Sequence, residues 1–506
     1  MSRTLPARLT VVSATALLVP SLFGQGTASL PACLENSIET KMDLGNLPGL
    51  AASIVRDGEV LWAGGFGSAN LDLGLAATAD TPFFMASISK TVTAVCLMQL
   101  REQGLLELDD DINDYLSFPV ENPNHPGVPI TFRHLLTHTS GLRDNWTIMD
   151  PLYQPGDSAF ALSTFLPDYL VPGGAFYDAG ANFYTWAPGS TYQYCNQAVS
   201  LVGLLVEVIA GQDFAEYAKD NVFTPLGMTN SSFRLADFDP DTIAMPYQWN
   251  AGTASYIPIG HYGYPDYPAG TMRSSVLDLM VFQQMIMEDG TYEGTQILTA
   301  ASVQEMRTVQ YPAINPQQGL VYYYNELFGN LTIGHDGGDP GVLSDMYYRP
   351  SDGIGVIIVA NSEGGFAQYY EIYQWLFSFA ESLATETVRE GTPPNPTAFQ
   401  PGLTSGPVVG ATWDPVIDHA TFMPASVLDF VAIGVTPTDI PTGLGTVLCG
   451  LNPPIVVTGT PGAPFAIALT EDCNHVGVSL CTQGGGVDAL LNIELTNALD
   501  ITIGTF

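Results

Sequence analysis

Residues 83–95 read FFMASISKTVTAV, in which Ser87 and Lys90 form a Ser-x-x-Lys pattern at the head of an apolar stretch. The chain contains only three lysines, so chance is a poor explanation for a lysine at this spacing. Residues three apart lie on one face of a helix, and a serine hydroxyl becomes nucleophilic when a neighbouring base takes its proton. The stretch therefore predicts a helix over about 87–103 that places an amine beside a reactive hydroxyl, an arrangement suited to acyl transfer.

Two later clusters contain residue types that suit the same chemistry. One is Tyr194-Cys195-Asn196, before an apolar helical pattern, and the other is His335-Asp336-Gly337-Gly338, at the end of a predicted strand. A phenol can transfer a proton, and glycines let a substrate lie close to a strand edge. No Gly-x-Ser-x-Gly motif occurs, so the nucleophile elbow of another hydrolase class is absent.

Together these clusters resemble the beta-lactamase-related serine hydrolases, a family with class C beta-lactamases, D-alanyl-D-alanine carboxypeptidases, D-aminopeptidases and some carboxylesterases. The resemblance covers roughly residues 33 to 385. Its landmarks are PGLAASIVRDGEVLWAGGFG (48–67), FFMASISKTVTAV (83–95), HLLTHTSGL (134–142) and GHDGGDPG (334–341). His134 and His138 have ligand-like spacing, but no glutamate is adjacent, and we interpret their stretch as structural.

The resemblance implies catalytic roles for four side chains. Ser87 would be the nucleophile that forms an acyl-enzyme. Lys90 and Tyr194 would form the proton-transfer network, with the lysine favouring the tyrosine phenolate. Asn196 would hydrogen-bond Lys90 or a substrate amide, although it could also simply cap the following helix.

The predicted strand motif would complete the site and departs from the family pattern. The backbone N–H groups of Ser87 and Gly338 would hold the oxyanion, with Gly337 beside them. Many beta-lactamases carry Lys-Thr-Gly here, which helps recognise an anionic carboxylate, whereas this chain has His335 and Asp336 in the first two positions. Asp336 would repel a substrate carboxylate if it faces the pocket, although strand alternation could turn it away. His335 is a fifth candidate catalytic residue, although a histidine at a strand end could also be structural. The departure favours neutral esters or amides, or substrates bearing an amine.

Composition excludes several other classes of function. The chain has 506 residues, 46% of them apolar, and a net charge of −37, which argues against binding nucleic acid or an anionic membrane surface. No apolar run beyond the N-terminus has membrane-spanning length. The run Asp109-Asp110-Asp111 suggests calcium, but Asp114 and Val120 stand where a calcium loop needs glycine and glutamate. We expect no metal and no organic cofactor.

The N-terminus predicts export. Arg3 and Arg8 precede an apolar stretch over 9–23, and small residues follow, as in a signal peptide over 1–24. A short membrane anchor, or a lipid attachment site at Cys33, are the alternatives. Export permits disulfides. Three of the six cysteines lie in the last sixty or so residues, which favours one pair among them, and Cys96 lies in an apolar helical pattern typical of a buried thiol.

The pattern of elements predicts an α+β fold and a separate C-terminal module. Early strands joined at Asp57-Gly58 and a late group of strands suggest one antiparallel sheet flanked by helices, with a mainly helical lobe from the middle of the chain. This serine hydrolase domain is predicted over 33–390. Residues 391–408 are rich in Pro, Gly, Thr and Ser and suggest a linker, and 409–506 suggest a small β-sandwich.

The sequence thus predicts an exported serine hydrolase that acts through Ser87 on a small-molecule or short-peptide substrate, an ester, amide or D-amino-acid peptide. A non-catalytic penicillin- or peptidoglycan-binding protein and a true beta-lactamase are the alternatives. The pattern does not indicate an oligomeric state.

Overall fold

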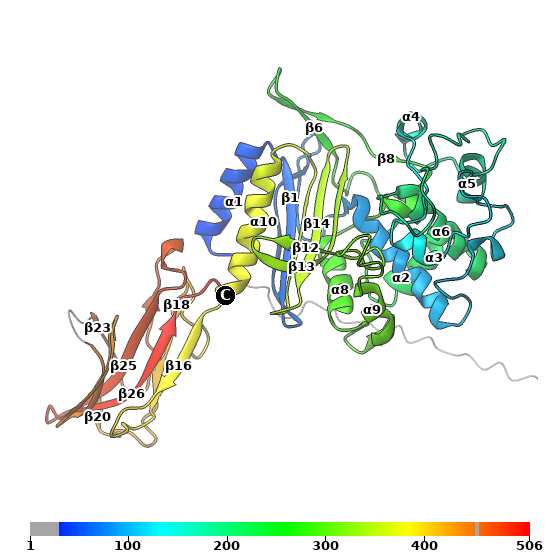
Figure 1. The fold of residues 1–506 in the computed structure, drawn as a ribbon. Coiled ribbons are helices and arrows are strands. Elements are labelled where there is room, and N and C mark those ends of the chain that lie inside the picture. The colour runs from blue at the N-terminus through cyan, green and yellow to red at the C-terminus, as the bar shows by residue number, and fades with distance from the viewer. Residues whose placement is uncertain (1–29, 451–454) are drawn as a thin grey trace, which may run out of the picture.

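The computed structural model describes residues 30–450 and 455–506 of the chain, so the predicted signal peptide lies outside the described residues. The chain forms a larger body of helices and sheet, followed by a smaller strand-rich body at the C-terminal end (Figure 1). This arrangement confirms the predicted α+β fold with a strand-rich C-terminal region.

A seven-stranded sheet, antiparallel throughout, forms the centre of the larger body. The N-terminal and late strands meet where β1 pairs with β15, as predicted. In sheet order the strands are β12 (Tyr323–Leu327), β13 (Asn330–Asp339), β14 (Val342–Arg349), β15 (Ile354–Ala360), β1 (Gly49–Arg56), β2 (Glu59–Asn70) and β3 (Leu75–Ala76).

Both faces of this sheet are covered by helices, and strand β1 shows how the sequence makes this possible. Its successive residues Ala51 and Ala52 are both buried but belong to two different apolar cores. The alternation of strand side chains thus yields a continuous apolar run where both faces are covered. Helices α1 (Ala32–Gly45) and α10 (Phe366–Glu381) cover one face, and α8 (Val276–Met287) packs on the other (Figure 1).

The helical lobe lies beside the α8 face and contains the remaining helices. Its central helix α6 ends at Gly211, whose φ of 67° fits a glycine that stops a helix in the left-handed conformation. The helices are α2 (Ser89–Glu102), α3 (Phe132–Leu136), α4 (Trp146–Met149), α5 (Leu162–Leu170), α6 (Asn196–Ala210), α7 (Phe214–Ala218) and α9 (Ala300–Arg307).

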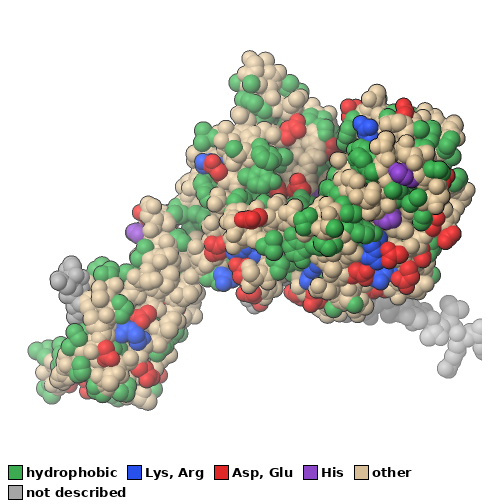
Figure 2. Space-filling view, in the orientation of Figure 1, with side chains coloured by type: hydrophobic (Ala, Val, Ile, Leu, Met, Phe, Trp, Pro, Cys, Tyr) green, Lys and Arg blue, Asp and Glu red, His purple; other side chains and the backbone are tan. Residues whose placement is uncertain are grey.

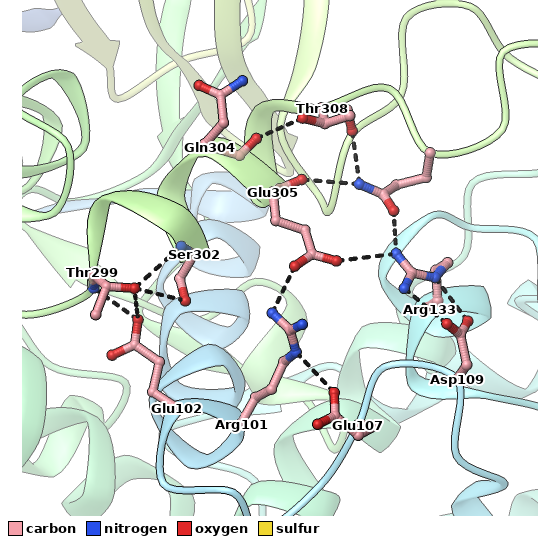
Figure 3. A network of polar contacts seen from close by, with 11 residues as sticks. Arg101, Glu102, Glu107, Asp109, Arg133, Thr299, Ser302, Gln304, Glu305 and Thr308 are labelled. Atoms are coloured by element: carbon pink, nitrogen blue, oxygen red, sulfur yellow. Dashed lines mark hydrogen bonds and ion pairs between the residues drawn. The ribbon is translucent and has the colours of Figure 1, made fainter.

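Ion pairs fix the far end of α2 to neighbouring elements. Arg101 on α2 donates to Glu305 on α9 at 2.6 Å, and Arg133 on α3 donates to the other oxygen of Glu305 at 3.4 Å (Figure 3). Arg133 also donates to the two carboxylate oxygens of Asp109 from its Nε and Nη2, at 2.8 and 2.9 Å. Charges joined in a network are a better source of stability than isolated surface pairs, and this network ties α2 to α3 and α9.

The C-terminal body contains a five-stranded antiparallel sheet and a few short strand pairs, with its own apolar core around Trp413 and Phe399. In order the sheet strands are β16 (Thr385–Arg389), β26 (Ile493–Thr502), β25 (Ser479–Asp488), β20 (Ser426–Gly434) and β23 (Ile455–Gly459). The short pairs are β17 (Phe399–Gln400) with β19 (Val416–Ile417), β18 (Thr412–Trp413) with β24 (Ile467–Ala468), and β21 (Pro437–Thr442) with β22 (Gly445–Cys449).

The predicted linker over 391–408 differs from the structure. Strand β16, which we placed at the end of the hydrolase domain, already pairs with β26 of the C-terminal sheet. Phe399 is fully buried in the C-terminal core, and its N–H donates to Asn497 at 2.8 Å. The segment is rich in Pro and Gly because it turns tightly within the C-terminal body, and the chain passes between the bodies over residues 382–384 instead.

Two kinds of contact join the bodies. A disulfide links Cys33 of α1 to Cys473 across 440 residues of sequence, and the Thr505 hydroxyl donates to the Phe379 carbonyl of α10 at 2.8 Å. A second disulfide, Cys449–Cys481, confirms the expected pair near the C-terminus, and Cys96 is a buried free thiol as predicted.

The surface carries the acidic charge that the composition requires. On the face shown in Figure 2, Asp and Glu side chains outnumber the basic ones. Within residues 30–450 and 455–506, no single helix has both the length and the apolarity to cross a membrane, although the bent pair Asn196–Ala210 and Phe214–Phe223 passes by length and composition alone.

Candidate active site

The predicted nucleophile lies in a tight turn between a strand and a helix. Strand β4 (Phe83–Phe84) pairs with β9 (Arg273–Ser274), and the chain then forms a 3-10 turn over Ala86–Ile88 before α2 begins. Ala86 has a φ of 46°, which an L-residue adopts only where its surroundings impose it. Ser87 is thereby held at the N-terminal end of α2, as the Ser-x-x-Lys pattern predicts.

The structure places the Lys90 amine directly against this serine. Lys90 is fully buried, and its Nζ lies 2.9 Å from Ser87 Oγ and 2.6 Å from the carbonyl oxygen of Ala269. Burial lowers the pKa of Lys90 to about 8, against the opposing effect of nearby carboxylates, chiefly Asp144 and Asp266. A lysine of this kind is neutral for part of the time near neutral pH and can accept the serine proton.

Tyr194 completes the group, but not as the phenolate that we expected. The Lys90 Nζ lies 5.0 Å from the centre of the Tyr194 ring. Burial raises the pKa of Tyr194 well above its usual value, and the neighbouring Ser87 side chain lowers it only in part. The hydroxyl is buried near Ser87, yet makes no hydrogen bond of ordinary geometry with any described residue. Desolvation therefore favours the neutral phenol, which makes Lys90 the candidate base.

Two side chains from the stretch before α4 hold Tyr194 in place. His138 packs its ring against Tyr194 with centroids 4.4 Å apart, and its Nδ1 accepts from the Cys195 N–H at 3.2 Å. Asp144 accepts from the N–H groups of Asn196 and Gln197 at 2.9 and 3.0 Å. A carboxylate from a distant segment thus occupies the N-terminus of α6, where the helix dipole favours negative charge.

Asn196 is the first residue of α6, and the hydrogen bonds of Lys90 go to Ser87 and Ala269 rather than to Asn196. Its side chain instead helps to line a small cavity beside Ser87. Of the roles we expected, hydrogen bonding to Lys90 has no support among the described contacts, and Asp144 rather than Asn196 caps the helix. Contact with a substrate amide is the role that this position favours.

Strand β13 brings its two glycines against the nucleophile turn. A Cβ on Gly337 would lie 2.6 Å from the Met85 carbonyl oxygen and 3.0 Å from the Ser87 nitrogen, whereas a Cβ on Gly338 would meet no atom within 4 Å. Gly337 therefore permits the close approach of strand and turn, and Gly338 borders open space. The N–H groups of Ser87 and Gly338 are thus on neighbouring elements, as an oxyanion site requires.

The two other residues of the strand motif point to different environments. His335 is only 2% exposed, and its ring lies 6.2 Å from that of Tyr194, so its position suits packing rather than contact with a substrate. Burial lowers the pKa of His335 to about 4 and keeps its ring neutral. Asp336 is 52% exposed, accepts a hydrogen bond from the Tyr323 hydroxyl, and lines a cavity that contains Ser87. Tyr323 in turn bonds Tyr347 of the core under α10, so the carboxylate lies on the α10 side of β13, whereas the next residue, Gly337, faces the Ser87 turn. Asp336 therefore lies at the rim of this cavity.

Three adjoining cavities surround Ser87 and Gly338. The Asp336 pocket, of about 470 Å³, is lined by Ser87, Tyr192, Tyr194, Asn315, Gln317, Gln318, Tyr323, Asp336, Gly337 and Gly338. The Asp266 pocket, of about 70 Å³, is lined by Ser87, Trp146, Tyr153, Asn196, Tyr264, Asp266, Ala269, Gly338 and Asp339. The Trp146 pocket, of about 560 Å³, is lined by Trp146, Asp150, Tyr153, Gly338, Asp339, Pro340, Val342, Leu343 and Glu363.

Sequence reasoning missed the carboxylates of this site. Asp144 and Asp266 are distant from Ser87 along the chain and carry no local motif. Asp339 directly follows the glycine pair, and that position was the one signal that could have drawn attention to it. The fold alone brings these groups around Lys90, and they act on its pKa.

A buried amine against a serine, with a phenol beside it and a glycine strand bordering the same cavity, is the arrangement expected of a serine acyl-transfer hydrolase. The family model described as Beta-lactamase matches residues 34–377, well over half of the chain. The chain belongs to this family of beta-lactamase-fold serine hydrolases.

Individual relatives agree with this membership. Penicillin-binding protein 4 of Amycolatopsis lactamdurans is 28% identical over 333 residues, which cover 64% of this chain and 82% of that protein. The octameric penicillin-binding protein homologue from Pyrococcus abyssi matches with a TM-score of 0.54 at 21% identity, over 93% of this chain and 99% of that chain. A D-stereospecific amidohydrolase from Streptomyces sp. matches with a TM-score of 0.51 at 23% identity, over 67% of this chain and 97% of that chain. The two structural matches are similarities of fold alone.

The lowered pKa of Lys90 predicts the pH dependence of catalysis. If Lys90 must be neutral to accept the Ser87 proton, kcat/KM for a neutral ester should rise about tenfold per pH unit and level off above about pH 8. Tyr194, whose pKa is raised, stays neutral over this range and adds no second change of kcat/KM with pH. The measurement is a kcat/KM profile from pH 6 to 9.5, corrected for spontaneous ester hydrolysis.

A charge-removing variant tests whether the rise of kcat/KM with pH reports the ionisation of Lys90. Asp144 raises the pKa of Lys90, so Asp144→Asn should move this rise to lower pH, because one negative charge that favours the ammonium is lost. An unmoved rise, or a profile that is flat between pH 6 and 8, would contradict the role of Lys90 as base.

Proposed function

We propose that this protein is an exported serine hydrolase that forms an acyl-enzyme on Ser87 and acts on an ester, an amide or a D-amino-acid peptide. The observation that carries the proposal is the 2.9 Å contact between Lys90 Nζ and Ser87 Oγ. This contact lies at the wall of a cavity that also exposes Tyr194 and Gly338. Nucleophile, base, proton carrier and oxyanion donor therefore meet at one place where a substrate can bind.

The geometry supports a sequence of proton transfers that starts at Lys90. The neutral amine takes the proton of Ser87 as its Oγ bonds to the substrate carbonyl carbon, and the N–H groups of Ser87 and Gly338 hold the resulting oxyanion. The leaving group then takes a proton from Tyr194, which recovers one from Lys90. In the second half-reaction a water bonds to the acyl carbon and gives a proton to the same network, which returns a proton to Ser87 Oγ as the acyl bond breaks and the acid leaves.

The pocket walls favour substrates without a carboxylate near the scissile bond. Asp336 occupies the position where Lys-Thr-Gly enzymes have a hydroxyl, and it is one of the residues that line the pocket with Ser87. Its negative charge would repel a substrate carboxylate. This observation supports an esterase or amidase over a true beta-lactamase. The names of the relatives, a penicillin-binding protein and a D-stereospecific amidohydrolase, suggest compounds with D-amino-acid character for the first assays.

Export is supported by the cysteines of the described chain. Four of the six cysteines form two disulfides, which persist in oxidising compartments. The predicted signal peptide precedes Cys33, whose disulfide joins the two bodies.

The competing proposal is a binding protein that has kept the fold without turnover. The contact between Lys90 and Ser87 argues against it, since a binding site has no need of a buried amine against a serine. One experiment separates the two. The purified protein is treated with a fluorophosphonate and with a fluorescent penicillin, and a panel of nitrophenyl esters, D-amino-acid amides and nitrocefin is assayed in parallel.

The expected result is a covalent fluorophosphonate adduct on Ser87, together with hydrolysis of at least one ester or amide at a higher kcat/KM than nitrocefin. The absence of both adduct and turnover would overturn the proposal in favour of a binding protein. Penicillin hydrolysis far faster than that of a short-chain ester would show a true beta-lactamase.

A further inference from the structure

The cavities around Ser87 are lined by carboxylates. Asp336 lies in the pocket on one side, and Asp266 and Asp339 lie in the small pocket on the other. Among the described residues that line the three cavities, none is a lysine or an arginine. The amine of Lys90 is buried and already bonded to Ser87 and Ala269. The site as a whole therefore presents negative charge to a ligand.

Asp266, which lines the Asp266 pocket, has one unsatisfied side-chain oxygen. This side chain is only 5% exposed, and its Oδ2 accepts from Gln197 Nε2 at 3.1 Å. Its Oδ1 is buried and has no hydrogen-bond partner among the described residues. A buried carboxylate oxygen without a donor is costly, so native structures provide one from the protein, from water or from a ligand. The cavity of about 70 Å³ that this residue lines has room for such a donor.

Asp339 faces the same volume and is held in place by two phenols. Its oxygens accept from Tyr153 at 3.2 Å and from Tyr264 at 2.7 Å. Burial raises the pKa of Asp339 to about 6 and that of Asp266 to about 7, so a positive charge between them would relieve an unfavourable environment. The pocket of about 70 Å³ has room for an ammonium group or a few waters.

The position of Tyr194 indicates which half of the substrate enters this pocket. Tyr194 lines the Asp336 pocket and is absent from the lining of the Asp266 pocket. The group that returns the proton must lie beside the leaving group. The leaving group therefore belongs on the Asp336 side, and the acyl group extends past Gly338 toward Asp266 and Asp339.

The pocket continues into a wider space with an aromatic wall. Trp146 and Asp339 line both the Asp266 pocket and the Trp146 pocket, and Trp146 is 48% exposed. An indole face beside carboxylates is a favourable surrounding for an organic cation. Asp150 and Glu363 add two more negative charges farther out.

We propose that the enzyme selects substrates whose acyl group carries a protonated amine next to the scissile carbonyl, and that Asp266 and Asp339 bind this amine. This inference rests on the proposed function, since it names the substrate class of the same site. The reaction is then removal of an amino-terminal acyl unit, as in an aminopeptidase or aminoacyl esterase. Cleavage next to a free carboxyl group, as in a carboxypeptidase, would place that carboxylate beside Asp336.

A pair of isosteric substrates tests the proposal. Alanine methyl ester and methyl isobutyrate differ only in an ammonium group against a methyl group, and alaninamide and isobutyramide form a second pair. Both enantiomers of alanine are assayed at pH 7, and each rate is divided by the hydroxide-catalysed rate, because an ammonium group activates its own ester. The corrected kcat/KM for one alanine enantiomer should exceed that of the isobutyryl compound by about tenfold or more, as expected for a charge-assisted hydrogen bond.

Two variants assign the preference to the named side chains. Asp339→Asn and Asp266→Asn each remove one charge at nearly constant shape, and each should reduce the alanine-to-isobutyryl ratio at least severalfold. Asp278→Asn is the matched control, because Asp278 is a buried carboxylate bonded to Ser231 at 2.8 Å and to the Asn230 N–H, and lines none of the three cavities. The alanine-to-isobutyryl ratio of Asp278→Asn should equal that of the wild type.

The outcomes distinguish this inference from the proposed function. A ratio near one in the wild type, or a ratio unchanged in both Asp339→Asn and Asp266→Asn, would overturn amine selection, while fluorophosphonate labelling of Ser87 still supported the hydrolase. If the wild type showed neither labelling nor turnover, both the proposed function and the amine selection would be overturned. If Asp266→Asn does not fold, Asp339→Asn alone decides the assignment.

Discussion

Replacing Ser87 by alanine should lower kcat/KM by about 10⁴-fold or more on any substrate that the enzyme hydrolyses, because the oxygen that forms the acyl-enzyme is removed. The Ser87 hydroxyl contacts Lys90 but contributes little to the apolar core, so the fold should survive the change. The measurements are steady-state kinetics, intact mass spectrometry after fluorophosphonate treatment, and thermal unfolding. A Ser87→Ala enzyme that keeps full activity would refute the mechanism.

The same four-residue stretch contains a matched control. Ser89 is also a buried serine, but its hydroxyl donates to the Ala86 carbonyl at 2.6 Å and accepts from the Met272 N–H at 3.0 Å. Ser89→Ala should lower the midpoint of thermal unfolding because it leaves the Met272 N–H without its acceptor. It should nevertheless still allow labelling at Ser87. If Ser89→Ala abolished labelling in a folded protein while Ser87→Ala did not, the nucleophile would be misassigned.

Local patterns in the sequence predicted the framework of the fold because each is decided by neighbouring residues. Asp57-Gly58 joins β1 to β2, and both residues adopt positive φ values, 52° and 83°, as a tight hairpin demands. Gly211 ends α6 for a similar reason. The Ser-x-x-Lys spacing gave the contact of Ser87 with Lys90, since a single helical turn determines it.

The features that the sequence did not reveal depend on contacts between distant segments. Asp144 reaches the N-terminus of α6 from 52 residues away, and Asp266 reaches Gln197 from 69 residues away. The predicted phenolate form of Tyr194 was wrong for a related reason. Proximity to Lys90 suggested a phenolate, but complete burial, which only the packed structure shows, outweighs that attraction.

The predicted linker failed because composition does not distinguish a flexible spacer from a tightly turned segment. Residues 391–408 contain the Pro and Gly that both require. Here Asn395 donates to the carbonyls of Thr446 and Thr496 at 2.7 and 2.9 Å, so the segment is fastened to the C-terminal sheet. Hydrogen bonds to distant strands determine whether such a segment is a linker or part of a domain, and these bonds leave no local pattern in the sequence.

The second large effect is expected at Gly337, where the catalytic turn and the sheet approach most closely. An alanine Cβ there would lie 2.4 Å from Ser344 Oγ, 2.6 Å from the Met85 carbonyl oxygen and 3.0 Å from the Ser87 nitrogen. The Ser344 hydroxyl could rotate away, although it would then give up its 2.9 Å hydrogen bond to Met85. The two backbone atoms belong to the turn that carries the nucleophile and cannot move independently of it.

Gly337→Ala should therefore push β13 away from the Ser87 turn and lower kcat/KM by about 100-fold or more, since displacements near 1 Å at a reacting group have effects of that size. Gly338→Ala is the informative comparison, because its Cβ meets no atom within 4 Å. It changes the neighbouring residue by the same methyl group, yet its loss of activity should be at least tenfold smaller than that of Gly337→Ala. Circular dichroism and thermal unfolding would verify that both variants are folded before their kinetics are compared. Equal losses in the two variants would contradict the prediction that the distance between β13 and the Ser87 turn limits catalysis.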